Sequence, residues 1–383
     1  LYNALSKSKG IRLWQFFLNG DYKMFNKTKL LLATGLLTMA GAANAGYEIK
    51  TGEDSSITFG GYVKVDTRYV SGNIQASDYW YGGGTVLAED ASNFGVAVNE
   101  SRLTTKYVHG DVTAYIGMDF YGGAVKGNGN EVISNSSNIR LRQAFIKYNN
   151  ILVGQAWTTF QNTSSLAESA DFGGPLVASA FIRQGQIRYT MGGLQVSIEN
   201  PETYGGNRPA AGFRNDNGPD LIAKYTFKGD WGNVSVSGLA RQLQSTSGNE
   251  ESALGYGIAG RINTVGKDDF RFQLHGGNVG RYIGVVASTD MVGEEVEDTT
   301  SVMVAYRHFW NKDLRSSVFY GNTTTDLTNR DRTHWGINLF KNVTKHLSYG
   351  VEIGQFEMAN ADDLTGGIGA DSMYGQFSVK YGI

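Results

Sequence analysis

The arginines between positions 138 and 191 are the residues of this sequence whose types and spacing suit a specific chemistry. Arg140 and Arg142 stand two residues apart, so both side chains project from the same face of an extended strand. Arg183 and Arg188 follow in the next strand-like segment. A guanidinium group binds a carboxylate through paired hydrogen bonds, and several guanidinium groups together concentrate anions. The pattern therefore predicts an anion-binding site whose geometry depends on the strands that carry it.

The connection between these two strand-like segments, residues 157–180, shows no alternation of polar and apolar side chains. A connection of this length inside a compact domain is usually a functional loop. We expect it to fold into the mouth of a β-barrel and to form, with the four arginines, the narrowest part of a pore.

Alternation of apolar and polar side chains recurs from residue 57 to the C-terminus. In the first such segment, Val63 and Val65 occupy one face, and Lys64, Asp66 and Arg68 occupy the other. We count about 16 segments of this kind, and the connections between them are short and long in strict alternation. This organisation predicts an all-β fold, a transmembrane antiparallel β-barrel of about 16 strands with a long, in-folded third loop and both chain ends on the side of the short turns.

The apolar face of such a barrel must point to lipid, because sixteen strands enclose an interior too wide for side chains to fill. On the polar, lumen-facing side, basic residues outnumber acidic ones. The residues that we expect to line the pore or to bind solute are Arg140, Arg142, Arg183, Arg188, Lys64, Arg68 and Arg102. The alternative is that such arginines pair with carboxylates of the in-folded loop, such as Glu168 and Asp171.

The same assignment of faces makes specific predictions about single positions. Val236 and Ile258 should face lipid, whereas Arg241 should project into water and tolerate exchange for glutamine. Tyrosines near the segment ends, on the apolar face, suit the interfacial girdle of an outer-membrane barrel.

The composition agrees with a barrel and excludes several other classes. The chain has 383 residues, of which 41% are hydrophobic, and it contains 51 glycines but only 4 prolines. The 21 tyrosines and 19 phenylalanines, with this glycine content, are typical of many short strands joined by tight turns. With no cysteine, the chain has no disulfide scaffold and no cysteine metal site.

The first 45 residues have the pattern of a processed segment. Met24 opens a short basic stretch, residues 30–40 are mostly apolar, and Ala43, Asn44 and Ala45 match a signal-peptide cleavage site. We expect residues 1–45 to be an upstream extension and a signal peptide that are removed, and residues 46–383 to form the outer-membrane barrel.

Several sequence pieces between residues 138 and 201 resemble the DcaP-like outer-membrane porins. These pieces are R-L-R-Q-A-F-I-K-Y, V-G-Q-A-W-T-T-F, D-F-G-G-P, R-Q-G-Q-I-R-Y-T and V-S-I-E-N-P. The resemblance implies a sixteen-stranded homotrimer that favours negatively charged small molecules such as dicarboxylates. It also implies that Arg140, Arg142, Arg183 and Arg188 lie near the constriction.

The function that we expect is passive diffusion of small anionic solutes, such as dicarboxylates, across the bacterial outer membrane. The alternative is a general, structural or adhesive barrel without strong solute preference, whose acidic outer loops, at residues 294–298 and at Asp362 and Asp363, bind divalent cations or lipopolysaccharide. We expect no enzyme activity, since the five histidines are scattered and none forms an H-x-x-x-H metal pair. We expect no cofactor and no nucleic-acid partner. The expected partners are small anions, outer-membrane lipid and lipopolysaccharide, and two further copies of the chain.

Overall fold

The structure is a computed structural model that describes residues 46–383, except for 76–78, 81–85, 123–136, 206–215, 217, 246, 285–287 and 360–368. The expected upstream extension and signal peptide lie outside the described residues. Most of the described chain is strand, and its helices are two short 3-10 turns. No helix in the described ranges is long and apolar enough to cross a membrane.

The strands follow one another along the chain as neighbours in one antiparallel sheet. They are β1 (Tyr47–Gly52), β2 (Ser55–Ile74), β3 (Val86–Ala97), β4 (Arg102–His109), β5 (Val112–Gly122), β6 (Asn138–Tyr148), β7 (Ile151–Trp157), β8 (Arg183–Met191), β9 (Leu194–Glu199), β10 (Asp220–Gly229), β11 (Gly232–Gln244), β12 (Glu250–Asn263), β13 (Asp269–Gly277), β16 (Thr299–Phe309), β17 (Leu314–Thr325), β18 (Asp331–Asn342), β19 (Leu347–Ala359) and β20 (Ala370–Gly382). A separate hairpin, β14 (Met291–Val292) with β15 (Glu295–Val296), lies in the connection from β13 to β16.

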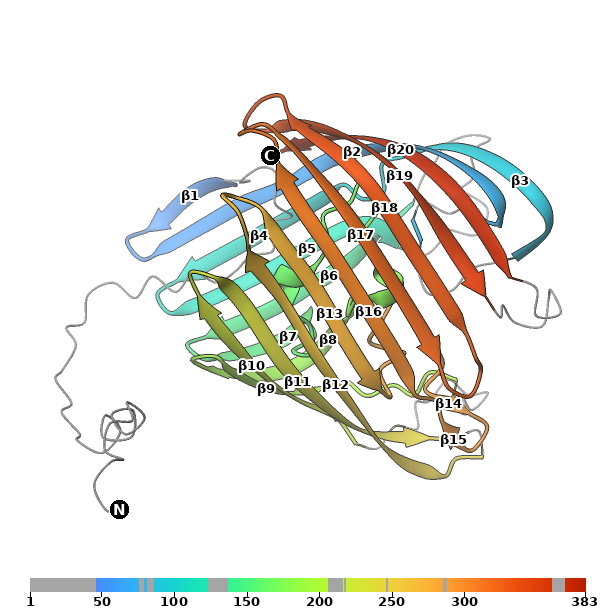
Figure 1. The fold of residues 1–383 in the computed structure, drawn as a ribbon. Helices are drawn as coiled ribbons and strands as arrows, with labels where there is room; N and C mark the ends of the chain where they lie inside the picture. Colours follow the sequence, from blue (N-terminus) through green and yellow to red (C-terminus); the bar gives the residue numbers. More distant parts are fainter. Residues whose placement is uncertain are drawn as a thin grey trace, which may run out of the picture. The chain divides into compact units, whose positions relative to one another are not determined.

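The sheet closes on itself because the last strand, β20, pairs with β2 from Tyr62 opposite Gly382 onward. Strands β3 and β4 both pair with β2, β3 along its second half and β4 along its first, so together they occupy one strand position. Counted in this way, the ring from β2 to β20 has sixteen positions, and the predicted sixteen-stranded antiparallel barrel is confirmed (Figure 1). Strand β1 extends the barrel wall beyond the end of β20 by pairing with the start of β2.

Apolar and polar side chains separate across the barrel wall as the alternation predicts. Val236 on β11 is 47% exposed, whereas its neighbours Ser235 and Ser237 are buried. Ile258 on β12 is 42% exposed, so both residues that we expected to face lipid lie on the outer face. The exposed tyrosines of this face include Tyr69, Tyr107, Tyr189, Tyr225, Tyr306 and Tyr381. The outer face is therefore the apolar one, as an outer-membrane barrel requires.

The turns at one end of the barrel are tight. β6 and β7 are joined by Asn149 and Asn150, and β8 and β9 by Gly192 and Gly193. Asn149 (φ 50°) and Gly192 (φ 59°) adopt the left-handed conformation that two-residue hairpin turns require.

Turns at this end have at most five residues, and connections at the other end have at least five. The expected strict alternation of short and long connections is therefore wrong at residues 245–249 and 326–330. At these two places the strands β11, β12, β17 and β18 continue into residues whose polar character had suggested a loop. The connections that remain are no longer than the turn at 264–268.

A bulge interrupts β6 next to the predicted site. Gly117 pairs with Gln143 and Met118 pairs with Leu141, so Arg142 is an extra residue on its strand. Beyond it the alternation changes phase, and Ile146 rather than Phe145 becomes the exposed residue. An inserted residue turns the following side chains to the opposite face, which a strict two-residue period cannot predict.

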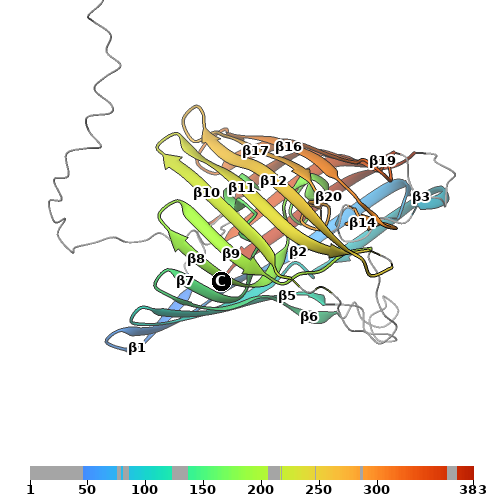
Figure 2. The ribbon, with the colours of Figure 1, turned by 90° about the horizontal axis from the view of Figure 1, so that it is seen from below.

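Residues 158–182, called the 158–182 segment below, join β7 to β8 and are buried almost throughout. The segment contains the 3-10 turns η1 (Thr163–Ser165) and η2 (Leu176–Ala178), which are drawn among the strands in Figures 1 and 2. Its backbone is held by polar side chains of distant strands. Lys224 Nζ on β10 donates to the carbonyl of Gln161 at 2.7 Å, and Thr323 Oγ1 on β17 donates to the carbonyl of Val177 at 2.6 Å.

Candidate anion-binding site

Asp119 is the carboxylate around which the predicted arginines gather. It lies directly opposite Arg140 in the pairing of β5 with β6. Arg140 donates from Nε to Oδ1 at 2.9 Å and from Nη2 to Oδ2 at 2.8 Å, the paired geometry that guanidinium groups form with carboxylates. Arg142 Nη1 donates to the same Oδ2. One carboxylate thus serves two guanidinium groups, and their combined charge stays positive.

Two more arginines complete this group. The Arg183 guanidinium lies over the Trp157 ring, 4.7 Å from its centre, and Arg142 lies over the same ring at 5.8 Å. Arg183 is within electrostatic range of Arg142, Arg140 and Arg102. Neither Arg183 nor Arg102 forms an ion pair within the described part of the chain, and one buried nitrogen of each has no hydrogen-bond partner there. We call Arg102, Arg140, Arg142 and Arg183 the arginine cluster.

Aromatic rings hold the arginine cluster without neutralising it. Phe172, in the 158–182 segment, lies 5.9 Å from Arg140 and 5.4 Å from Arg142. Tyr121 on β5 lies 5.3 Å from Arg140 and packs against the same phenylalanine. Ring faces attract cations but leave their N–H groups available. The segment that we expected to narrow the pore therefore contacts the arginine cluster directly.

Arg188 lies apart from this cluster. Its Nη1 donates to the carbonyl of Trp157 at 3.4 Å, and it interacts electrostatically with Glu199. Lys224, on β10, is within electrostatic range of both residues. The sequence analysis placed Arg188 in one group with Arg183. The two residues are five positions apart on β8, and this separation gives Arg188 a different set of partners.

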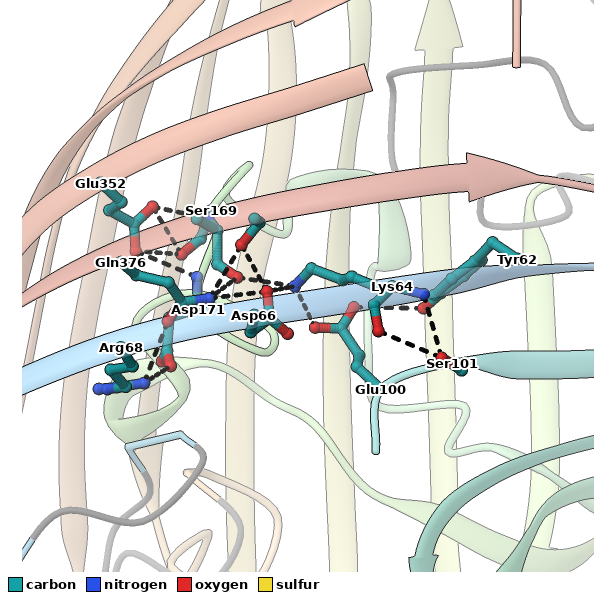
Figure 3. A network of polar contacts seen from close by, with 12 residues as sticks. Tyr62, Lys64, Asp66, Arg68, Glu100, Ser101, Ser169, Asp171, Glu352 and Gln376 are labelled. Carbon is teal, nitrogen blue, oxygen red and sulfur yellow. Dashed lines mark hydrogen bonds and ion pairs between the residues drawn. The ribbon is translucent and has the colours of Figure 1, made fainter. Parts of the chain in front are cut away.

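Lys64 and Arg68, the predicted pore residues on β2, are engaged with acidic side chains (Figure 3). Lys64 Nζ bonds Glu100, lies 3.2 Å from Asp66, and donates to the carbonyl of Ala170 at 2.7 Å. Arg68 bonds Asp171 of the 158–182 segment. For Arg68 the alternative interpretation, pairing with loop carboxylates, is the one that the contacts support.

A comparison with known proteins identifies the family. The sequence model of a porin subfamily matches residues 42–277. The chain belongs to this porin subfamily. Porins are passive channels of the bacterial outer membrane and not enzymes, so the expected class, localisation and absence of catalysis are confirmed at that level. We found no match among curated protein sequences.

Solved structures of porins share the fold of this porin. The outer membrane channel DcaP of Acinetobacter baumannii has 19% identity and a TM-score of 0.74, over 88% of this chain and 99% of that chain. An anion-selective porin from Comamonas acidovorans has 13% identity and a TM-score of 0.55, over 86% of this chain and 100% of that one. OmpT of Vibrio cholerae, folded in vitro, has 12% identity and a TM-score of 0.54, over 88% and 100%. At these identities the likeness concerns the fold alone.

Glu352 on β19 holds the 158–182 segment in place, and the sequence alone did not single it out. It accepts hydrogen bonds from Ser169 Oγ at 2.8 Å and from the backbone N–H groups of Ala170 at 2.7 Å and Asp171 at 3.2 Å (Figure 3). Asn338 and Tyr374 donate to the same carboxylate. This porin thus clamps its 158–182 segment with a side chain from β19. More than 180 residues of sequence separate the partners, and no local pattern marks such a contact.

Proposed function

We propose that this porin is a diffusion channel that favours small anionic solutes such as dicarboxylates. The observation that carries the proposal is the arginine cluster, in which two of the four guanidinium groups bond one carboxylate, Asp119, and the other two form no ion pair among the described residues. A low-dielectric wall with one sign of charge concentrates ions of the opposite sign. One structural neighbour, from Comamonas acidovorans, is an anion-selective porin, which agrees with this assignment.

The arrangement suits transient binding rather than capture. Arg183 and Arg102 each carry one buried nitrogen without a hydrogen-bond partner among the described residues, while Asp119 keeps Arg140 and Arg142 partly neutralised. Conduction requires binding that is favourable enough for entry and weak enough for exit. A dicarboxylate can engage two guanidinium groups at once, which gives it an advantage over a monovalent anion of similar size.

We also propose that the chain is a homotrimer in the outer membrane and that export removes residues 1–45. The resemblance to the DcaP-like porins supports the trimer, and the Ala43 to Ala45 pattern supports the cleavage. Crosslinking of the purified protein should give a trimer band that disappears on heating. N-terminal sequencing should show that the mature protein begins at Gly46.

The reversal potential in a potassium chloride gradient tests the anion preference. The double substitution of Arg140 and Arg142 by glutamate should reverse or abolish the preference for chloride and slow dicarboxylate flux, because it inverts the charge of the cluster. The matched control is the double substitution of Lys312 and Lys345 by glutamate, since both are exposed residues of short turns and change the net charge equally. A double arginine variant with the selectivity of the wild type would contradict the proposal and favour a general barrel.

A further inference from the structure

Arginines of the barrel wall bind the Glu168 carboxylate of the 158–182 segment in the way that they would bind the carboxylate of a ligand. Arg315 on β17 donates from Nε to both carboxylate oxygens, at 2.9 and 3.0 Å, and from Nη2 to Oε1 at 2.7 Å. Arg307 on β16 donates from Nη1 to Oε2 at 3.3 Å. All three side chains are buried. This is the paired geometry by which guanidinium groups recognise carboxylate ligands.

The remaining charges around Glu168 favour an anion even without it. Asp269 accepts hydrogen bonds from Arg307 and from Arg271, which also donates to the carbonyl of Leu166. With Glu168, three arginines face two carboxylates; without Glu168, they face only Asp269. Arg315 Nη1 donates to Asn342 Oδ1 at 3.0 Å, so Glu168 is not the only group that positions the guanidinium among the described residues.

This group of residues is separate from the arginine cluster. Its cations belong to β13, β16 and β17, whereas those of the arginine cluster belong to β4, β6 and β8. Arg307 and Arg315 flank the short turn at residues 310–313, and Arg140 lies near the long-loop end of β6. The Glu168 group therefore lies toward the short turns, whereas Arg140 lies toward the long loops.

We propose that Arg307 and Arg315 form a second carboxylate-binding site in the lumen, which Glu168 occupies in the resting channel. Carboxylate solutes compete with Glu168 for this site. Glu168 belongs to the same chain and competes as an intramolecular ligand, so a solute carboxylate must reach a high local concentration to displace it. Displacement releases one of the bonds that hold the 158–182 segment against the wall, and the bound solute changes the channel that it crosses.

Acetate inhibition of the chloride current through the full chain in planar bilayers tests the inference. Glu168→Ala vacates the site, so acetate should halve the chloride current at a concentration about tenfold lower than in the wild type, because the internal competitor is gone. Glu295→Ala, which removes an equal charge from an exposed loop position, should leave the acetate response unchanged. The double variant Glu168→Ala with Arg315→Gln should lose the gained sensitivity.

A Glu168→Ala channel with the acetate response of the wild type would overturn the inference, and so would a double variant that keeps the gain. If Glu168→Ala does not fold, Glu168→Asp retains the charge on a shorter side chain and should give a smaller gain that also depends on Arg315. This comparison concerns a site other than the arginine cluster. Its result is therefore independent of the reversal potential of the Arg140 and Arg142 variant, which tests the proposed function.

Discussion

Asp119 on β5 and Arg140 on β6 are direct cross-strand partners, and both oxygens of the carboxylate accept hydrogen bonds from the guanidinium group. Arg142 bonds the same carboxylate from the adjacent bulge. Among the described residues, no other carboxylate forms an ion pair with a member of the arginine cluster. Asp119 therefore neutralises part of the positive charge of the arginine cluster.

Replacing Asp119 by asparagine should increase the preference for anions. The substitution keeps the shape of the side chain and removes the negative charge that, among the described residues, forms the ion pairs with the arginine cluster. A unit charge at contact distance contributes about 1 kcal/mol in water, so we expect a roughly two- to fivefold rise in the chloride to potassium permeability ratio. Reversal potentials measure it, with Asp111→Asn at an exposed turn as the control. An unchanged ratio would mean that solutes do not approach Asp119.

Replacing Glu352 by alanine should loosen the 158–182 segment. Five donors lose their acceptor, including the backbone N–H groups of Ala170 and Asp171, and buried groups without partners are costly. We expect a loss of about 3 kcal/mol in the free energy of unfolding, and larger, noisier single-channel currents. Glu352→Gln should retain part of both properties, because its amide oxygen still accepts hydrogen bonds. Quiet currents of wild-type size in the alanine variant would show that the segment is held by other contacts.

The Asp171 carboxyl should make the docking of the 158–182 segment sensitive to pH. Burial raises its pKa to about 7; Arg68 opposes this shift, and Glu352 adds to it. The unfolded carboxyl has a pKa of about 3.9, so between these values the folded protein binds a proton that the unfolded one does not. The stability that this proton gives to the folded protein is therefore fully present below about pH 4, and it is lost as the pH rises toward 7.

The unfolding temperature, followed by gel mobility after heating, measures this effect. Between pH 8 and pH 5 the wild type should gain stability relative to Asp171→Asn, which has no proton to bind. Parallel pH profiles for the two proteins would assign the pH dependence to other groups.

Arg241 should be among the least replaceable residues of the barrel, which corrects the expectation that glutamine would be tolerated. Its side chain is fully buried and bonds Asp290 at 2.6 Å, Asp220 at 3.3 Å and Asn278 at 2.7 Å. Removing one partner from a buried ion pair costs about 3–5 kcal/mol, so Arg241→Gln should lower the free energy of unfolding by about this amount. A lysine at lipid-facing Val236 should cost a similar roughly 2–4 kcal/mol.

Urea unfolding of Arg241→Gln measures this cost. Adding Asp290→Asn should recover part of it, because the unpaired buried charge is then removed. An Arg241→Gln variant as stable as the wild type would support the original expectation that Arg241 projects into water.

The sequence alone determined the architecture, because the features that encode it are local. A strand presents side chains to opposite faces every two residues, so Val63 and Lys64 already specify lipid and lumen. Asn149 and Gly192 mark tight turns, since their neighbourhoods favour left-handed backbone. The number of strands follows from counting these patterns, and it agrees with the closed sheet.

Only the tertiary structure decided which charges remain available. Arg68 and Arg315 look like Arg140 in the sequence, yet they bond Asp171 and Glu168 across more than 100 residues. The bulge at Arg142 shifts the phase of its strand, and the path of the 158–182 segment depends on contacts with β2, β16, β17 and β19 together. Pairing between charges depends on distances of a few ångströms in the folded chain, and these distances arise only when the barrel closes and brings distant strands around one segment.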